Sequence, residues 1–396
     1  TDYKADQILM KGTSLGGSSQ FPDKEILNIS QINSVAMVGG IGNFSKVDLS
    51  KALAGKRASV GAGVSATTET VSGSCSPKDF ETMMQLTYLT FTAPRRDDEA
   101  FASYKNRNKA ALLNQEMNPN VAFSDSITFA LQMGHPRTIR MKADMIDNMD
   151  YNKILAMYQD RSKDASDFTF ILVGNVDVES MKPLIAEYLG ALPTINRKES
   201  FKDNKIEYRK GVYKNEFVRE QETAKASNFV SFIGTCKYDL KNSILQDMTC
   251  QIMDLVYTEK VREDEGGTYG VYVGGNLSKY PNEIAGIQIV FDTAPSKREK
   301  LMKIIFAEIE RISKEGPSEA NLNKVKEFML KKHAEDLKEN SYWMESIDEY
   351  LFTGMNPIKN YEQTVNSITA KDIQKFADDL FKQKNEVEVS MISPDK

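Results

Sequence analysis

The 396-residue sequence has few of the residues from which metal sites and disulfide frameworks are built. It contains three cysteines (Cys75, Cys236 and Cys250) and two histidines (His135 and His333). The cysteines show no CxxC spacing, and we interpret all three as small buried hydrophobic residues. Cys236 and Cys250 could pair only if the fold brings them together. No HxxH, HExxH or HxxEH motif is present, so the sequence offers no self-contained histidine site for zinc.

The sequence also lacks a strong excess of one charge and any long apolar run. The chain has 51 Lys and Arg against 56 Asp and Glu, interspersed, which makes a nucleic-acid partner unlikely on physical grounds. No uncharged apolar run approaches the length of a membrane span. The chain opens on Thr1-Asp2-Tyr3-Lys4 and already reads as a strand at Ile8 and Met10. We therefore expect a fragment, in which a missing targeting segment says nothing about compartment.

The histidines and one glycine-rich stretch could suggest functional sites, but the sequence around them does not support this interpretation. His135 lies at a predicted helix exit and His333 at the edge of a helical apolar stripe. Either could titrate, but we expect structural or solvent-facing roles. Residues 39–42 (Gly-Gly-Ile-Gly) follow a helix-like segment, whereas a dinucleotide fingerprint follows a strand. We expect a helix end and a turn there, before a helix capped by Ser45 or Asp48.

One arrangement of strands and helices occurs twice. In each half a strand pair is followed by a proline that begins a long helix, and Pro77 and Pro295 are 218 positions apart. A second helix enters at 97–99 and 317–319, and a later helix leads to a final strand in each half. The predicted strands are 57–64, 69–75 and 168–173 in the first half, and 268–275, 284–293 and 387–392 in the second. The nearly constant offset indicates a tandem duplication.

The duplication predicts two homologous α+β units of about 200 residues. We place them at 1–200 and 201–396, with the joint in the polar stretch Ile195–Lys210. Strands joined by short turns predict antiparallel pairing, and the helices follow one another instead of alternating with strands. Each unit should be an antiparallel sheet with helices packed on one face, rather than a doubly wound parallel sheet.

The segment 261–270 places a cation and a phenol seven residues apart across a diglycine turn. Apolar residues before it recur at helical spacing, and those after it alternate with a period of two. We predict Arg262 in the last turn of a helix and Tyr269 at the start of a strand, with Gly266 and Gly267 supplying the turn. Both side chains could then face one cleft. From spacing alone they could equally be a surface arginine near a helix end and an ordinary strand tyrosine.

Several short sequence segments resemble the C-terminal half of the M16 zinc peptidases (the pitrilysin or insulinase family). Among these peptidases, the segments are most similar to the periplasmic, PqqL-like bacterial members. They occur in matching order along the whole chain: 1–4 with 6–8, 14–18, 42–45, 49–56, 76–81, 91–95, 261–270 and 339–343.

The resemblance implies a protein of four homologous units of the LuxS/MPP-like metallohydrolase fold, arranged as two halves that close around substrate. Zinc would be bound in the N-terminal half by an HxxEH motif and a further glutamate, which this chain lacks. The C-terminal half would contribute an arginine and a tyrosine, spaced as Arg262 and Tyr269 are, that reach the substrate next to the metal. A guanidinium or phenol donor can stabilise a developing oxyanion, while a metal-activated water attacks.

Three functions therefore remain open. The first is a zinc metalloendopeptidase whose substrates are peptides or small unfolded proteins, with this chain as its non-zinc half, its N-terminal half as partner, and a periplasmic location by resemblance. The second is a non-proteolytic structural or regulatory partner in which the pair is vestigial. The third is a peptide-binding module without a catalytic partner.

Overall fold

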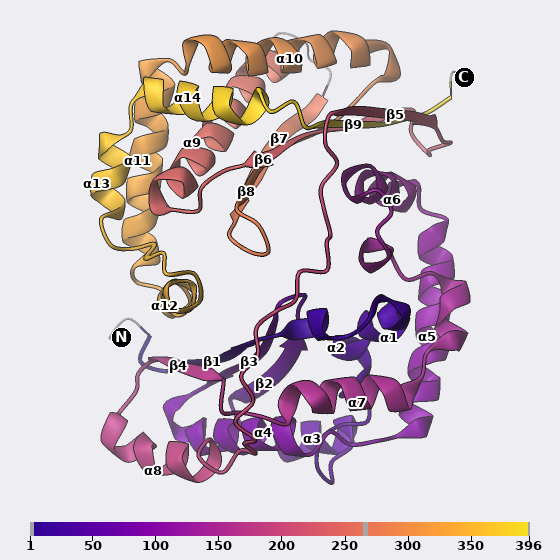
Figure 1. Ribbon diagram of the computed structural model, residues 1–396, viewed down its shortest axis with the longest axis vertical. Helices are drawn as coiled ribbons and strands as arrows, with labels where there is room; N and C mark the ends of the chain where they lie inside the picture. Colours follow the sequence, from indigo (N-terminus) through magenta and orange to yellow (C-terminus); the bar gives the residue numbers. More distant parts are fainter. Residues whose placement is uncertain (1–3, 264–267, 395–396) are drawn as a thin grey trace. The chain divides into compact units, whose positions relative to one another are not determined.

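The computed structural model describes residues 4–263 and 268–394, with side chains for all of these except 261–263, 268 and 269. It contains two compact units, each with its own sheet and core (Figure 1). The first unit comprises Thr1–Gln115, Met141–Lys205 and Asp336–Asp348, and the second Glu116–Arg140, Ile206–Glu335 and Glu349–Lys396.

The sheet of the first unit is antiparallel and four-stranded, in the order β2-β3-β1-β4. Side chains on the central strand β1 alternate between its faces. Ile8 and Met10 pack with Phe80 and Met83 in one core cluster, whereas Leu9 belongs to another cluster. The strands are β1 (Ile8–Leu15), β2 (Ala58–Val64), β3 (Thr68–Cys75) and β4 (Thr169–Gly174).

Helix α4 of the first unit begins after Pro77 and α5 near residues 97–99, as the sequence predicts. Pro77 opens a short 3-10 turn that leads into α4, and Asp150 caps α7 by accepting hydrogen bonds from the backbone N–H groups of Asn152 and Lys153. Ser45 caps α3 through the N–H of Asp48, as expected for the turn after residues 39–42. The helices are α1 (Ile26–Ile29), α2 (Ile32–Val35), α3 (Lys46–Ala52), α4 (Phe80–Thr92), α5 (Asp98–Glu116), α7 (Tyr151–Ser162) and α8 (Val178–Tyr188).

The sheet of the second unit has five strands in the order β5-β9-β6-β8-β7. Its pairs are antiparallel except β5 with β9, which run parallel, so this sheet is mixed. The middle residues of β6 and β9 are buried along continuous runs, as is typical of strands covered on both faces. The strands are β5 (Val212–Val218), β6 (Ala226–Thr235), β7 (Thr268–Ser278), β8 (Ile284–Thr293) and β9 (Glu386–Ile392).

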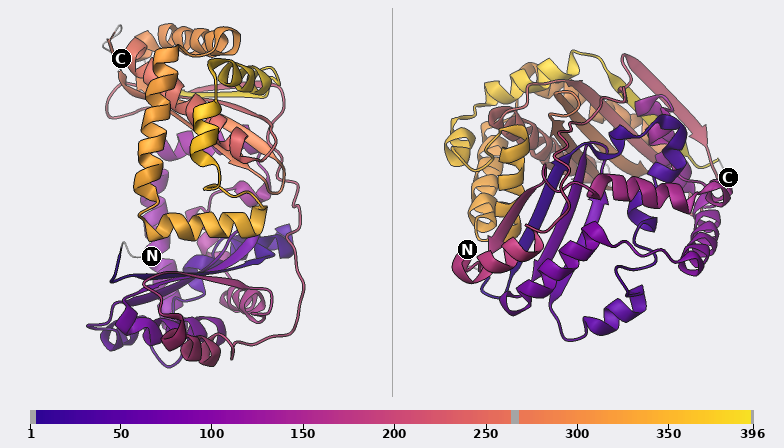
Figure 2. Two further views of the ribbon diagram at one scale, coloured as in Figure 1. Left: turned by 90° about the vertical axis from the view of Figure 1, so that its left-hand side faces the viewer. Right: turned by 60° about the horizontal axis from the view of Figure 1, so that its bottom comes forward.

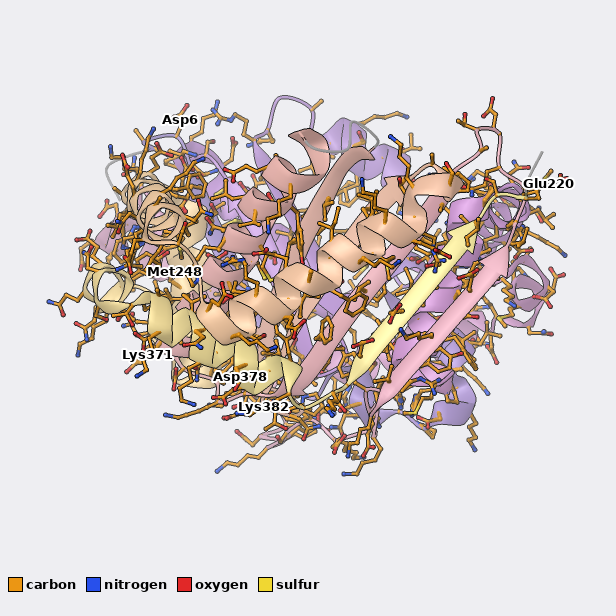
Figure 3. All side chains as sticks on the ribbon, turned by 90° about the horizontal axis from the view of Figure 1, so that it is seen from above. Asp6, Glu220, Met248, Lys371, Asp378 and Lys382 are labelled. Carbon is orange, nitrogen blue, oxygen red and sulfur yellow. The ribbon has the colours of Figure 1, made fainter. Side chains whose placement is uncertain are left out.

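Helices of the second unit have one apolar face each, which α14 illustrates. Ile373, Phe376 and Leu380 are buried, while Lys371, Asp378 and Lys382 project along the opposite side into solvent (Figure 3). The helices of the second half of the sequence are α9 (Leu240–Tyr257), α10 (Arg298–Glu315), α11 (Glu319–Asp336), α12 (Asn340–Thr353), α13 (Tyr361–Ser367) and α14 (Ala370–Phe381).

Each unit takes one helix from the other half of the sequence. Helix α6 (Pro119–Gln132) packs Phe123 and Ala130 against Val387, Val389 and Met391 of β9 in the second unit. Helix α12 packs Met344 and Trp343 against Ile171 and Val173 of β4 in the first unit, where it lies across the sheet (Figure 2). We call these two helices the exchanged helices.

The exchanged helices correct one detail of the predicted fold and add a feature that the sequence did not show. The α+β class is confirmed, but both sheets have helices on their two faces instead of one, because α12 and α6 cover the second face. The compact units also differ from the halves 1–200 and 201–396, since residues 116–140 and 336–348 lie in the opposite unit. The position of the repeat boundary near residue 200 stays a prediction.

The predicted linker Ile195–Lys210 contains no helix or strand, and its beginning is fixed to the first unit. Asp164 is completely buried and accepts hydrogen bonds from the N–H of Ile195 (3.1 Å), the N–H of Arg197 (2.6 Å) and the hydroxyl of Ser166 (2.7 Å). Burial alone would raise the pKa of Asp164, but these donors outweigh it and lower the pKa to about 2.

A buried arginine, Arg161, makes a second attachment between the predicted linker and the first unit. Arg161 donates to Glu69 (3.0 Å) and to Glu199 (2.7 Å) of the linker stretch. The side chains of Arg161 and Glu69 are only 4% and 6% exposed. Glu69 also accepts from the N–H of Gly17 (2.9 Å), while its second oxygen has no partner among the described residues. We call Arg161, Glu69 and Glu199 the arginine cluster.

Candidate functional site

The predicted Arg262–Tyr269 pair lies where α9 gives way to β7. Helix α9 ends at Tyr257 and continues as a π-helical turn, η6 (Thr258–Glu263), which contains Arg262. Tyr269 is the second residue of β7, and α9 packs along this strand (Figure 1). The backbone prediction of a helix end and a strand start is therefore confirmed. The turn residues Asp264–Gly267, and the side chains of Arg262 and Tyr269, lie outside the described part of the chain.

The backbone is irregular on both sides of this turn. A π-helical turn is rare and often marks a functional position. On the strand side, the register of β7 against β8 shifts between Thr268 and Val271, which is a β-bulge, and Gly270 in the bulge has φ +136°. Such a bulge changes the direction of nearby side chains and is common beside active sites.

The π-helical turn is attached to α10 through a buried carboxylate. Lys260 of the turn donates to Glu308 (2.7 Å), and Arg311 donates to the same carboxylate through Nε (2.8 and 2.9 Å). The Glu308 side chain is 1% exposed. Burial alone would raise its pKa, but the hydrogen bonds from Arg311 and Lys260 outweigh this and hold the pKa below its usual value. One turn earlier, the buried Tyr257 hydroxyl donates to the carbonyl of Ile305 (3.0 Å).

These contacts fix the backbone next to Arg262. Because Tyr257 and Lys260 are both bonded to α10, the end of α9 and the π-helical turn have a defined position on the core of the second unit. An ionised Glu308 is required for the ion pairs, and its lowered pKa keeps it ionised at neutral pH.

A cavity of about 730 Å³ lies between α9 and β7, with a third wall from α11. Its α9 wall consists of Ser243, Gln246, Asp247, Cys250, Gln251, Asp254 and Leu255, which recur at helical spacing on one face. Residues 272–277 of β7 form a second wall, and Lys324, Val325 and Phe328 the third. All of these residues belong to the second unit.

Gly275 of β7 makes room for a side chain that lines this cavity. Gln246 reaches past it and donates to the carbonyl of Gly286 (3.0 Å). A Cβ atom on Gly275 would meet that carbonyl oxygen at 2.6 Å and the sulfur of Cys250 at 2.9 Å, as well as Gln246 itself. The absence of a Cβ atom at position 275 is therefore a packing requirement.

Substitution Gly275→Ala should lower the free energy of unfolding by about 1–3 kcal/mol, because a backbone oxygen cannot move as a flexible side chain can. The matched control is Gly61→Ala on β2, where a Cβ would meet nothing within 4 Å. Thermal unfolding followed by circular dichroism compares the two. Equal midpoints for both variants would show that the crowding at Gly275 is relieved without cost.

The histidines and acidic side chains of the described residues form no metal site. Among the described residues, no three His, Cys, Asp or Glu side chains come together in a way that could hold a metal ion, so zinc does not fit this part of the chain. His135 caps a short turn by accepting from the N–H of Arg137 (3.2 Å), and the buried His333 stacks on Tyr361 at 4.2 Å between ring centroids. Both histidines thus have the structural contacts that were expected.

The cysteines are all free thiols, and Cys75 and Cys250 are buried as expected, with Cys236 half-buried. Burial raises the pKa of the Cys75 and Cys250 thiols to about 12 and that of Cys236 to about 11, with nearby carboxylates adding to the effect. None is a thiolate at neutral pH, so none is an activated nucleophile.

The cavity is the feature that the sequence prediction missed. Its signal is present in α9, where the polar residues 243, 246, 247, 251 and 254 form a stripe beside the apolar positions that predicted the helix. Such a stripe is usually a solvated face. Here it is partly buried, since Gln246 is 4% exposed.

The described residues form a two-unit α+β protein and contain no cluster of side chains that could hold a metal ion. Residues 148–329 match the model of the M16 peptidase family that describes its inactive domain. The predicted resemblance to the C-terminal half of an M16 peptidase is confirmed.

Its relatives are larger zinc proteases. The chain is 26% identical over 368 residues to the zinc protease PQQL-like of Arabidopsis thaliana, covering 88% of this chain and 35% of that protein. It superposes on the periplasmic protease PqqL of Escherichia coli with a TM-score of 0.83 and 16% identity, covering 98% of this chain and 43% of that one. It also superposes on the first half of the E. coli protein alone, with a TM-score of 0.75, 14% identity and coverage of 98% and 87%.

The chain spans 35% of the length of the Arabidopsis thaliana protein and 43% of the Escherichia coli protease. None of the helices within residues 4–263 and 268–394 combines the length and the apolar character needed to cross a membrane.

Proposed function

We propose that this chain is the non-zinc-binding C-terminal half of a zinc metalloendopeptidase. In this proposal the N-terminal half of the same protein holds the zinc ion and supplies the metal chemistry. The present half encloses the peptide and contributes Arg262 and Tyr269 to substrate binding and to the transition state. Substrates would be peptides or small unfolded proteins that fit a closed chamber.

The observation that carries this proposal is the position of the two residues. Arg262 lies on the π-helical turn and Tyr269 near the start of β7, and the backbone of both elements is irregular at these positions. The π-helical turn is bonded to the core through Lys260 and Glu308, which is what a residue with a fixed catalytic geometry needs. The match of residues 148–329 to the M16 inactive domain supports the peptidase context.

The chemistry assigned to the pair is binding and charge stabilisation. A phenol and a guanidinium can both donate hydrogen bonds to the oxygen of a scissile carbonyl. Their contribution grows as negative charge develops on that oxygen, so they should act on the rate of the chemical step more than on binding.

A periplasmic location is proposed on the likeness to the E. coli protease, which is periplasmic. An alternative is a non-proteolytic M16-like partner subunit, in which Arg262 and Tyr269 have no substrate. The upstream coding sequence separates these two functions, because an HxxEH motif there supports the peptidase and its absence supports the partner subunit.

The activity test compares the intact protein with the purified 396-residue chain on a quenched fluorescent peptide. The intact protein should cleave it and lose activity with a chelator, whereas the chain alone should be inert. Peptidase activity of the chain alone that a chelator abolishes would overturn the proposal. An inert intact protein would favour the partner subunit instead.

A further inference from the structure

The cavity between α9, β7 and α11 is lined by a residue with a buried hydrogen-bond acceptor that has no donor among the described residues. Gln246 uses its amide nitrogen on Gly286, and its buried carbonyl oxygen has no partner among the described residues. An unpaired polar atom at this burial costs about 1–3 kcal/mol unless a ligand or water satisfies it. The unsatisfied oxygen therefore indicates that something with a donor belongs here.

Two carboxylates on the same face of α9 add negative charge. Asp247 accepts from the side-chain nitrogen of Gln251 (3.0 Å), and Asp254 accepts from the N–H of Val273 (3.3 Å). Both donors are neutral, and no ion pair of either carboxylate is found among the described side chains. Lys324 is the one cation that the described lining residues contain, so carboxylates outnumber cations two to one.

Two aromatic rings at the cavity remain exposed. Tyr272 on β7 is 60% exposed and Phe328 on α11 is 57% exposed, and both line the cavity. An exposed aromatic face binds a cation, and it stacks especially well on a planar guanidinium.

We propose that this cavity binds the guanidinium group of an arginine side chain on a peptide. A guanidinium carries a positive charge, which suits a cavity wall with two carboxylates, and five N–H donors, which can bond a carboxylate or an amide oxygen such as that of Gln246. Its flat faces match the exposed rings of Tyr272 and Phe328. The protonated Cys250 thiol in the lining is no nucleophile, so the site binds without covalent chemistry.

The place of the cavity connects it to the proposed peptidase. Tyr272 follows Tyr269 by three positions, about 10 Å along a strand. The inference that the bound arginine belongs to a substrate rests on the proposed function, whereas the binding itself does not. Cleavage would then favour peptides with an arginine a few residues from the scissile bond.

A binding experiment on the 396-residue chain tests the site without catalysis. The probes are two fluorescein-labelled ten-residue peptides that differ only in one central residue, arginine or citrulline. Citrulline has nearly the same shape and no charge. We expect the arginine peptide to bind at least about tenfold more tightly at low salt, with the difference shrinking as salt screens the exposed charges.

The double substitution Asp247→Asn with Asp254→Asn should remove that preference and leave the citrulline peptide unchanged. Asparagine keeps the carbonyl that accepts from Val273, so the fold is retained, and unchanged thermal unfolding checks this. Glu299→Gln, at an exposed position of α10 outside the cavity, should alter neither affinity. Phe328→Ala should weaken arginine binding about threefold.

Equal affinity for the two peptides, or an arginine preference that survives the double substitution, would overturn the site. Arginine-selective binding in a protein without peptidase activity would keep the site and reject the proposed function. If the intact protein is a peptidase whose rate does not depend on arginine, and the two peptides bind equally, the proposed function would stand and the arginine site would be rejected.

Discussion

Replacement of Tyr269 by Phe in the intact protein is expected to lower kcat for peptide cleavage by about 10²–10³-fold, with KM changed much less. Loss of one donor to a developing oxyanion has an effect of this size. The ground-state carbonyl is a weaker acceptor than the oxyanion, so binding of substrate loses little. Steady-state kinetics on a quenched fluorescent peptide provide both constants.

The control for this substitution is Tyr350→Phe, which removes the same hydroxyl from a side chain that is 52% exposed on α12. It should leave both constants unchanged. A Tyr269→Phe enzyme with the kcat of the natural protein would return Tyr269 to an ordinary strand residue. A rise in KM alone would instead assign it to binding that is equal in the ground and transition states.

The second large effect is expected in the arginine cluster. Substitution Arg161→Met should lower the free energy of unfolding by about 3–5 kcal/mol at neutral pH, because it leaves the buried Glu69 carboxylate without a cation. Glu199 and Asp160 are more exposed, at 18% and 31%, and can turn to water. The control is Arg57→Met, whose pair with Asp6 is exposed and should cost less than about 0.5 kcal/mol.

The pH dependence of this loss has a definite sign. Burial already raises the pKa of Glu69 in the folded protein, against the opposing effect of Arg161, and removal of the arginine raises it further. A carboxyl with a raised folded pKa favours folding when protonated, so the deficit of Arg161→Met should be greatest at neutral pH and shrink as the pH falls toward about 4.

The double variant Arg161→Met with Glu69→Gln isolates the cause. Glutamine keeps an acceptor for the N–H of Gly17 and carries no charge, so most of the stability should return and the pH dependence should vanish. Denaturant unfolding at several pH values measures both. A double variant as unstable as Arg161→Met would mean that packing of the arginine, not the charge of Glu69, sets the loss.

Local pattern was enough to predict much of the fold. The hairpins of β2 with β3 and of β7 with β8 follow from a period of two around short turns, and the helix starts at Pro77 and Pro295 from their position after a strand. The offset between the two sets indicated the duplication. These features depend on neighbours within a few residues, which the sequence displays directly.

Partners far apart in the sequence could not be predicted in this way. Phe123 and Ala130 show that α6 has an apolar face, but nothing in their spacing says that β9 of the other half covers it. The parallel pairing of β5 with β9 joins residues about 170 positions apart, and no turn fixes its register.

The site was predictable to a similar extent. The change of period around Gly266 and Gly267 located Arg262 and Tyr269 on the backbone, while the roles of their side chains stay predictions. The unpaired oxygen of Gln246 depends on Gly275 and Gly286, which are near it only in the folded chain.

The exchanged helices also determine when the chain can finish folding. Met344 and Trp343, which cover Ile171 and Val173 of the first unit, are synthesised only after most of the second unit. Until then a growing chain holds a sheet with one apolar face open to water, the kind of surface on which nascent chains aggregate or recruit chaperones. The two halves of the sequence therefore become native together, and cutting the gene near residue 200 would separate each sheet from its exchanged helix.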